Sequence, residues 1–297
     1  MKLQMADCRM QIGWGIGAVA LVLMIFSGGA VPRAQDGVAP GVAGVDVRRQ
    51  TLDEILDLYV RDGSVYYRAL KGERNRLDGY VRDLGTLTNA AVDGDSREEQ
   101  IAFWLNAYNA IVLQTVIDHY PIAGQSRAYP ARSIRQIPGA FERVTHRVAG
   151  RTVTLDQIEQ TILPAFHDPR VYLALGRGAV GSGRLRSEAY AGSRIEQQLA
   201  GDASECLSRA QCVDVDRVSN SVKVSSIFSW RERDFVAAFT GKAAAAFGTR
   251  SPVERAVLAF VDPRLLAGER EFLARNTFKV EYIPFDWDLN DLTGRGR

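Results

Sequence analysis

The chain has 297 residues, of which 46% are hydrophobic and 24% are charged, and its formal net charge at pH 7 is +2. This composition excludes an intrinsically disordered protein. The near-neutral balance gives no overall field toward nucleic acid or acidic lipid. The basic residues are 32 Arg and five Lys, but the Arg residues are scattered and no run of them predicts a nucleic-acid patch. We therefore expect a globular protein that does not bind nucleic acid.

The N-terminal segment, residues 1–34, has the pattern of a secretory signal peptide. A positively charged start precedes an apolar run of 15 residues over 12–26, and small residues then lead to Ala30 and Ala34. Cleavage after either alanine is expected. The apolar run by itself is short for a membrane span, and the alternative is an uncleaved anchor that runs from Ile12 to about Val31. We expect an exported protein, periplasmic or extracellular, that touches a membrane only if this segment remains.

Residues 35–50 are rich in Gly, Ala, Pro and Val without a period, so we expect a flexible tether there. One domain then spans residues 51–297, because no linker or repeat divides the rest of the chain. Apolar side chains with a period of 3.6 residues predict its helices. In chain order they lie at residues 51–60, around 77–84, 96–120, 154–164, 193–207, 226–239, from 252 onward, and up to about 275. The predicted capping pairs are Ser96 with Glu99, Thr154 with Gln157, and Ser193 with Glu196.

Short extended segments alternate irregularly with these helices. They are a short piece at 64–70, a hairpin over 141–154, a strand at 170–175, a hairpin over 212–224 and a closing strand at 277–283. No regular strand–helix–strand order is visible. The sequence therefore predicts one α+β domain, with mixed helices around a small, mostly antiparallel sheet with β-hairpins.

The stretch FWLNAYNAIVLQTVIDHYP at 103–121 predicts a central helix, because its apolar side chains point in nearly every direction. Asn106 and Asn109 are the exceptions. A buried amide without partners costs about 1–3 kcal/mol, so both side chains should be hydrogen-bonded. They either tie loop backbone to the core or present amide donors to a ligand.

Cys206 and Cys212 are the cysteines that remain once the signal segment is removed. Two cysteines six residues apart in an oxidising compartment predict a disulfide bond, with two free thiols as the alternative. The three histidines are scattered, which predicts no zinc site, and we expect no cofactor.

The loop GRGAVGSGRLRSE at 176–188 is the strongest local signal for a site. It lacks the opening helix and the acidic residue of a dinucleotide site. Glycine backbone N–H groups can converge on an anion, and Arg177, Arg184 and Arg186 can add charge-assisted hydrogen bonds. The alternative is a tight structural loop whose Arg residues pair with Glu188 and other carboxylates.

Ser182 is a weak candidate nucleophile in this loop, and His119 is the weak candidate base. A serine needs a base within hydrogen-bond reach, and nothing in the sequence assembles a triad. For His119, a place at the C-terminal end of the central helix, where a cation suits the helix dipole, is the alternative role.

Together these segments resemble an uncharacterised family catalogued as domain of unknown function 547. The resemblance covers nearly all of residues 51–292, and it implies an exported bacterial member with no assigned activity. The segments that carry it are FWLNAYNAIVLQTVIDHYP, TLDQIEQTIL, DPRVYLALGRGAVGSGRLRSEAY, VSSIFSWRERDF and YIPFDWDLN, with LDLYVRDGSVYYRAL fitting the bacterial members.

The departures from the family pattern concern chemistry. Many members resemble N-C-G-A-x-x-C-P in the loop and L-D-D-I-E-H in the helix before it, whereas this chain has Arg177, Ser182 and Gln160 at the Cys, Cys and His positions. If the family's Cys and His act as a thiolate–imidazole pair, this chain lacks both, and Gln160 cannot serve as a base. The positions that carry over are Trp104, Asn106, Asn109, Arg186, Glu188 and Tyr190.

Three hypotheses for function follow. The leading one is an exported protein that binds a small anionic ligand or an envelope partner through the Gly/Arg loop without catalysis. The second is a serine hydrolase or acyl transferase that uses Ser182. The third is a structural module of the cell envelope. A hydrogen bond between Ser182 Oγ and an imidazole would separate the second from the others.

Overall fold

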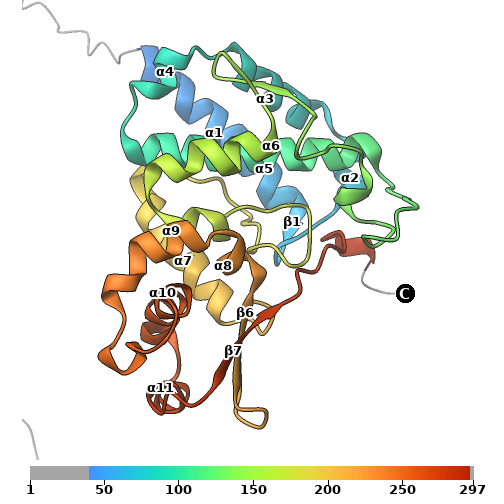
Figure 1. The fold of residues 1–297 in the computed structure, drawn as a ribbon. Coiled ribbons are helices and arrows are strands. Elements are labelled where there is room, and N and C mark those ends of the chain that lie inside the picture. The colour runs from blue at the N-terminus through green and yellow to red at the C-terminus, as the bar shows by residue number, and fades with distance from the viewer. Residues whose placement is uncertain (1–39, 295–297) are drawn as a thin grey trace, which may run out of the picture. The chain divides into compact units, whose positions relative to one another are not determined.

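Helix α5 (Arg97–His119) runs through the middle of the fold in the computed structural model, which describes residues 40–294 (Figure 1). Helices α2, α3 and α7 pack against it. Ser96 caps its first turn by accepting the backbone N–H of Glu99, and Pro121 ends it because proline cannot continue a helix. The predicted central helix is therefore confirmed.

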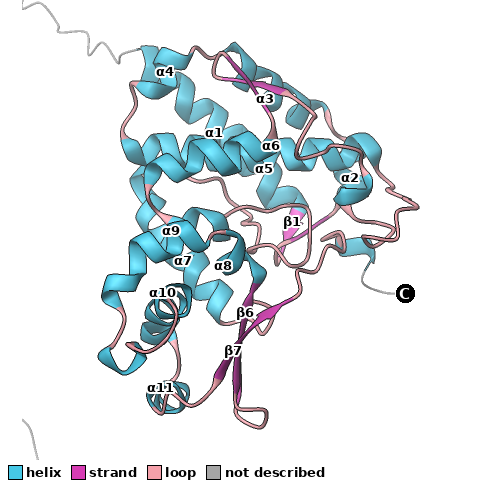
Figure 2. Ribbon diagram, viewed as in Figure 1, coloured by secondary structure: helices cyan, strands magenta, loops and turns pink. Residues whose placement is uncertain are grey.

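Helices dominate the chain, and the strands are confined to three small sheets (Figure 2). The helices are α1 (Pro40–Tyr59), α2 (Tyr67–Gly72), α3 (Asn75–Thr86), α4 (Asn89–Asp93), α5, α6 (Leu155–Gln157), α7 (Ile195–Leu207), α8 (Ser226–Trp230), α9 (Glu232–Phe239), α10 (Pro252–Val261) and α11 (Ala267–Ala274). The strands are β1 (Val60–Arg61), β2 (Ser64–Val65), β3 (His146–Val148), β4 (Arg151–Val153), β5 (Val213–Asp216), β6 (Ser221–Ser225) and β7 (Lys279–Ile283). The described part of the chain is one α+β domain, as predicted.

The largest sheet joins segments that are distant in sequence. Strand β6 pairs antiparallel with β5, which confirms the predicted hairpin. On its other side β6 pairs parallel with β7, so the closing strand is the exception to an otherwise antiparallel set. The hairpin of β3 and β4 is confirmed as well. A disulfide bond between Cys206 and Cys212, with the Cα atoms 5.4 Å apart, ties the end of α7 to the start of β5.

Two predicted boundaries at the N-terminal side differ from the structure. The signal segment at 1–34 and the first residues of the predicted tether lie outside the described residues. Helix α1 begins at Pro40, so the rest of the predicted tether at 35–50 is helical. The extended piece predicted at 64–70 is limited to β2, and α2 begins at Tyr67.

Three further predictions were wrong in detail. The strand predicted at 170–175 is a 3₁₀ helix over Pro169–Leu173, because the Asp168 side chain accepts the backbone N–H of Arg170 and Pro169 suits a helical first turn. The helix predicted at 226–239 is two helices that meet at Arg231. Ser193 does not cap α7, since a 3₁₀ turn over Gly192–Arg194 leads into that helix.

No helix in the described part of the chain, residues 40–294, is both long enough and apolar enough to span a bilayer.

Candidate functional site

Two asparagine side chains on α5 fix both ends of the glycine-rich loop. Asn109 donates to the carbonyl of Ala174 at 3.2 Å and accepts the backbone N–H of Gly176 at 2.8 Å. One turn earlier, Asn106 donates to the carbonyl of Tyr190 at 2.9 Å and accepts the N–H of the same residue at 2.8 Å. Of the two roles predicted for Asn106 and Asn109, this is the structural one.

These four hydrogen bonds explain why α5 carries amides in an apolar stretch. Both asparagines are buried, and each side-chain amide forms one hydrogen bond as donor and one as acceptor with loop backbone. Asn106 forms both bonds with a single residue, and Asn109 forms them with two residues that are close in sequence. A loop that enters the core needs such partners, because its backbone N–H and C=O groups are not paired within a helix or a sheet. The loop is thus attached to the central helix at residues 174–176 and at Tyr190.

Arg177 is buried inside the molecule. Its guanidinium forms an ion pair with Glu159 at 2.7 Å and donates to the carbonyl of Tyr172 at 3.2 Å. Arg231 approaches Glu159 from α8–α9, also at 2.7 Å, and donates to Gln160 at 2.7 Å. Arg177, which was predicted to bind a ligand, is instead part of a three-residue ionic cluster with Glu159 and Arg231.

The charges of this cluster shift the titration of its carboxylate. Burial by itself would raise the pKa of Glu159, but the charges of Arg177 and Arg231 and their hydrogen bonds outweigh it and lower the pKa to about 2. Tyr108 donates its hydroxyl to the same carboxylate at 3.1 Å, and burial raises the pKa of that phenol well above its ordinary value. The cluster therefore stays ionised at neutral pH.

Ser182 lies across the loop from Arg177 and has no base beside it. Its Oγ accepts the backbone N–H of Arg177 at 3.0 Å, and its own N–H donates to the carbonyl of Ala179. All three imidazoles fall within the described residues, and none is a hydrogen-bond partner of Ser182. His119 Nδ1 instead contacts the carbonyl of Thr115 at 2.9 Å in the last turn of α5. The structure does not bring Ser182 and His119 together.

Arg184 and Arg186 are paired with carboxylates. Arg184 forms ion pairs with Asp62 and Glu205, each at 3.1 Å. Arg186 pairs with Glu188, and with Asp202 at 2.8 Å. Both guanidinium groups thus have the carboxylate partners foreseen in the structural alternative for this loop.

A cavity of about 480 Å³ beside these two arginines is acidic overall. Burial raises the pKa of Asp202, although Arg186 opposes the shift. The predicted anion-binding nest is not supported here, since carboxylates outnumber guanidinium groups by six to two. The six are Asp53, Asp57, Asp62, Glu188, Asp202 and Glu205.

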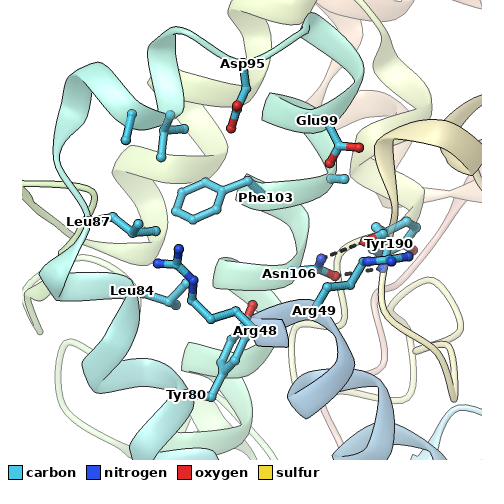
Figure 3. Close-up of a pocket in the computed structure, with 13 residues that line it drawn as sticks. Arg48, Arg49, Tyr80, Leu84, Leu87, Asp95, Glu99, Phe103, Asn106 and Tyr190 are labelled. Carbon is cyan, nitrogen blue, oxygen red and sulfur yellow. Dashed lines mark hydrogen bonds between the residues drawn. The ribbon is translucent and has the colours of Figure 1, made fainter. Parts of the chain in front are cut away.

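A mainly apolar pocket of about 190 Å³ lies between α1, α3, α4 and α5, on the N-terminal half of the central helix (Figure 3). Phe103 points into it from α5 toward Leu84 and Leu87, while Asp95 and Glu99 lie at one end and Arg48 and Arg49 at the other. The remaining lining residues are Tyr80, Ala91, Val92, Ala102, Asn106 and Tyr190. We call it the Phe103 pocket.

The Phe103 pocket adjoins the loop attachment, since Asn106 and Tyr190 belong to both. The sequence did not indicate this pocket, because its walls come from four helices that are separate in the sequence and meet only in the fold. The sequence shows Phe103 and Trp104 side by side, but only the structure shows that Trp104 is fully buried and that Phe103 is half-buried and lines a pocket. Among residues 40–294, no group of three or more His, Cys, Asp or Glu side chains is arranged to hold a metal ion.

Comparison with known proteins gives one match. Residues 92–207 match the model of the family described as "Protein of unknown function, DUF547". No curated protein and no solved structure matches the sequence. The matched range includes α5, the ionic-cluster residues Glu159 and Arg177, the glycine-rich loop and α7, and it is shorter than the 51–292 over which the resemblance was expected. Residues 92–207 of this chain therefore belong to the DUF547 family.

Proposed function

We propose that the protein is a non-catalytic binding protein that takes a small, uncharged and mainly apolar ligand in the Phe103 pocket. The observation that carries this proposal is the pocket itself. It combines an aromatic side chain and several aliphatic ones with a few polar groups at its ends. Such a lining is typical of small-molecule sites.

The volume and the charges of the pocket limit the ligand. An apolar cavity of about 150 Å³ is large enough for benzene, and drug-sized ligands need about 300 Å³ or more. A cavity of about 190 Å³ therefore suits a small aromatic group, such as benzene or indole, or a short acyl chain. Its two guanidinium groups and two carboxylates balance, so they favour a neutral ligand over an anion.

The proposal excludes covalent catalysis because the family positions where a thiol and an imidazole are expected hold other groups. Arg177 is engaged with Glu159, and Gln160 accepts a hydrogen bond from Arg231. Ser182 has a backbone N–H as the partner of its Oγ. A serine whose oxygen only accepts a hydrogen bond has nothing to take its proton.

Calorimetric titration with indole, a small neutral aromatic molecule of suitable size, tests this function. The wild-type protein should bind indole, and Ala102→Leu should weaken binding at least tenfold because the longer side chain fills the pocket from α5. Ala200→Leu on α7 is the matched control, since Ala200 is part of another surface. Failure of the wild type to bind indole, or equal binding by Ala102→Leu, would refute the assignment.

We further propose that the protein is exported, with mature protein beginning after Ala30 or Ala34. The support is the positively charged start, the apolar run and the small residues in the first 34 positions. Intact-mass measurement of protein from the cell envelope tests this. A mass that includes the N-terminal segment would favour the anchored form.

A further inference from the structure

A second cavity lies at the opposite end of α5 from the Phe103 pocket. It has a volume of about 350 Å³ and is lined by α2, the loop that follows α5 and the C-terminal segment at 289–293. In Figure 1 these three segments lie together on the side where the C-terminus is marked. Phe103 and Tyr120 are 17 residues apart along the helix, which corresponds to roughly 25 Å at 1.5 Å per residue. The two cavities are therefore separate.

Two arginines that line this cavity have no partner of their own. Among residues 40–294, neither Arg68 of α2 nor Arg132 forms an ion pair or a side-chain hydrogen bond. Both are exposed. This distinguishes them from Arg177, Arg184 and Arg186, which carboxylates already neutralise.

The one carboxylate in the lining is already occupied. One oxygen of Asp291 accepts the hydroxyl of Tyr120 at 2.8 Å. The other accepts the backbone N–H of Thr293 at 3.0 Å and its hydroxyl at 2.9 Å. Lys71 donates to the carbonyl of Tyr120 and adds positive charge next to the cavity. The hydrogen-bond donors in the lining that remain available for a ligand are thus the two guanidinium groups.

We propose that this cavity binds an organic oxyanion. Guanidinium groups bind carboxylates and phosphates through paired, charge-assisted hydrogen bonds. Arg68 and Arg132 come from different segments, so they can hold one head group between them. Ile122 and Leu289 provide an apolar wall for the rest of the molecule. The site is independent of the Phe103 pocket and of its neutral ligand.

The proposal is tested by titrating the full exported protein with benzoate, phenyl phosphate and inorganic phosphate. Binding is monitored through NMR chemical shifts. Benzoate and phenyl phosphate share a ring, so the tighter of the two identifies the head group. The double variant Arg68→Gln/Arg132→Gln should weaken both at least tenfold, and added chloride should weaken wild-type binding. Arg233→Gln, an exposed and unpaired arginine on α9, is the matched control and should stay within twofold.

Several results would overturn the proposal. One is the absence of binding of either aromatic anion by the wild type, and another is equal binding by the double variant. If inorganic phosphate binds as tightly as phenyl phosphate, the apolar wall has no role and an organic ligand is wrong. If Ala102→Leu removes benzoate binding, the ring occupies the Phe103 pocket instead. We expect the double variant to fold, because neither arginine has a partner to lose, and circular dichroism checks this.

Discussion

The Oγ of Ser182 and the backbone N–H of Arg177 form a hydrogen bond of 3.0 Å that closes the glycine-rich loop on itself. The serine is 7% exposed, and its oxygen is directed at the chain and not at solvent. The two residues therefore stabilise the loop. Arg177 thus connects the loop to the ionic cluster through its side chain and to Ser182 through its backbone N–H.

Replacement of Ser182 by alanine should lower stability and leave reactivity unchanged. The substitution leaves a buried N–H of Arg177 without an acceptor, which costs about 1–3 kcal/mol in the free energy of unfolding. Urea denaturation measures this, with Ser187→Ala, an exposed serine of the same loop, as the control. A fluorophosphonate probe should label neither the wild type nor the variant. Labelling that disappears in Ser182→Ala would support the hydrolase hypothesis instead.

Gly183 should not tolerate a side chain. A Cβ added there would lie 1.6 Å from the carbonyl oxygen of Leu173, which is backbone and cannot swing away. We expect Gly183→Ala to reduce the free energy of unfolding by more than about 2 kcal/mol. Gly72→Ala is the control, since a Cβ at that last residue of α2 meets nothing within 4 Å and should change the free energy of unfolding by less than about 1 kcal/mol. Equal melting temperatures for the two variants would contradict the loop packing.

Glu159 should make the protein sensitive to acid. Its pKa is about 2 in the fold against an ordinary 4.5, so its stabilising effect is complete above pH 4.5 and is lost as the pH falls toward 2. The size of this effect is about 3 kcal/mol. Glu159→Gln should be less stable at pH 7 by about 3–5 kcal/mol, because the two arginines stay buried without their counter-charge.

Urea denaturation at a series of pH values checks this expectation. Between pH 4.5 and 2 the variant should lose less stability than the wild type, since it has one titrating group fewer. Glu98→Gln, an exposed carboxylate on α5, is the control and should follow the wild-type curve. A variant curve parallel to that of the wild type would mean that Glu159 is not a depressed carboxylate.

Asn109 should be important for stability despite its polar character. Asn109→Ala removes the partners of the Gly176 N–H and the Ala174 carbonyl, both in the core. We expect a loss of about 2–4 kcal/mol, from two unsatisfied buried groups. Thermal unfolding measures it against Asn75→Ala, an exposed asparagine at the start of α3. A loss no larger than that of the control would show that the amide does not hold the loop.

The local chemistry of the sequence predicted most of the fold. The apolar stretch around Trp104 indicated the central helix, and Thr154 with Gln157 indicated a helix start that the structure confirms with a complete capping box. The strand prediction at 170–175 was wrong because its apolar residues suit a buried strand as well as a buried turn. What decides between them is the Asp168 side chain, whose hydrogen bond to Arg170 fixes a helical turn.

The site was harder to predict because pairing is a property of three-dimensional neighbours. In the sequence alone, an anion site is suggested by the closeness of Arg177, Arg184 and Arg186 in one loop. Their partners Glu159, Asp62, Glu205 and Asp202 come from other segments, and no spacing rule places them. Arg68 and Arg132 lie far apart in the sequence, so nothing there indicated that they line one cavity.

Diffraction from a crystal of this protein pressurised with xenon tests the central claim most directly. Xenon enters apolar cavities of about this size. The account predicts a xenon peak between Phe103 and Leu84 in the wild type and its loss in Ala102→Leu. A Phe103 pocket that holds ordered water, or no xenon at all, would contradict the claim that it takes a small apolar ligand.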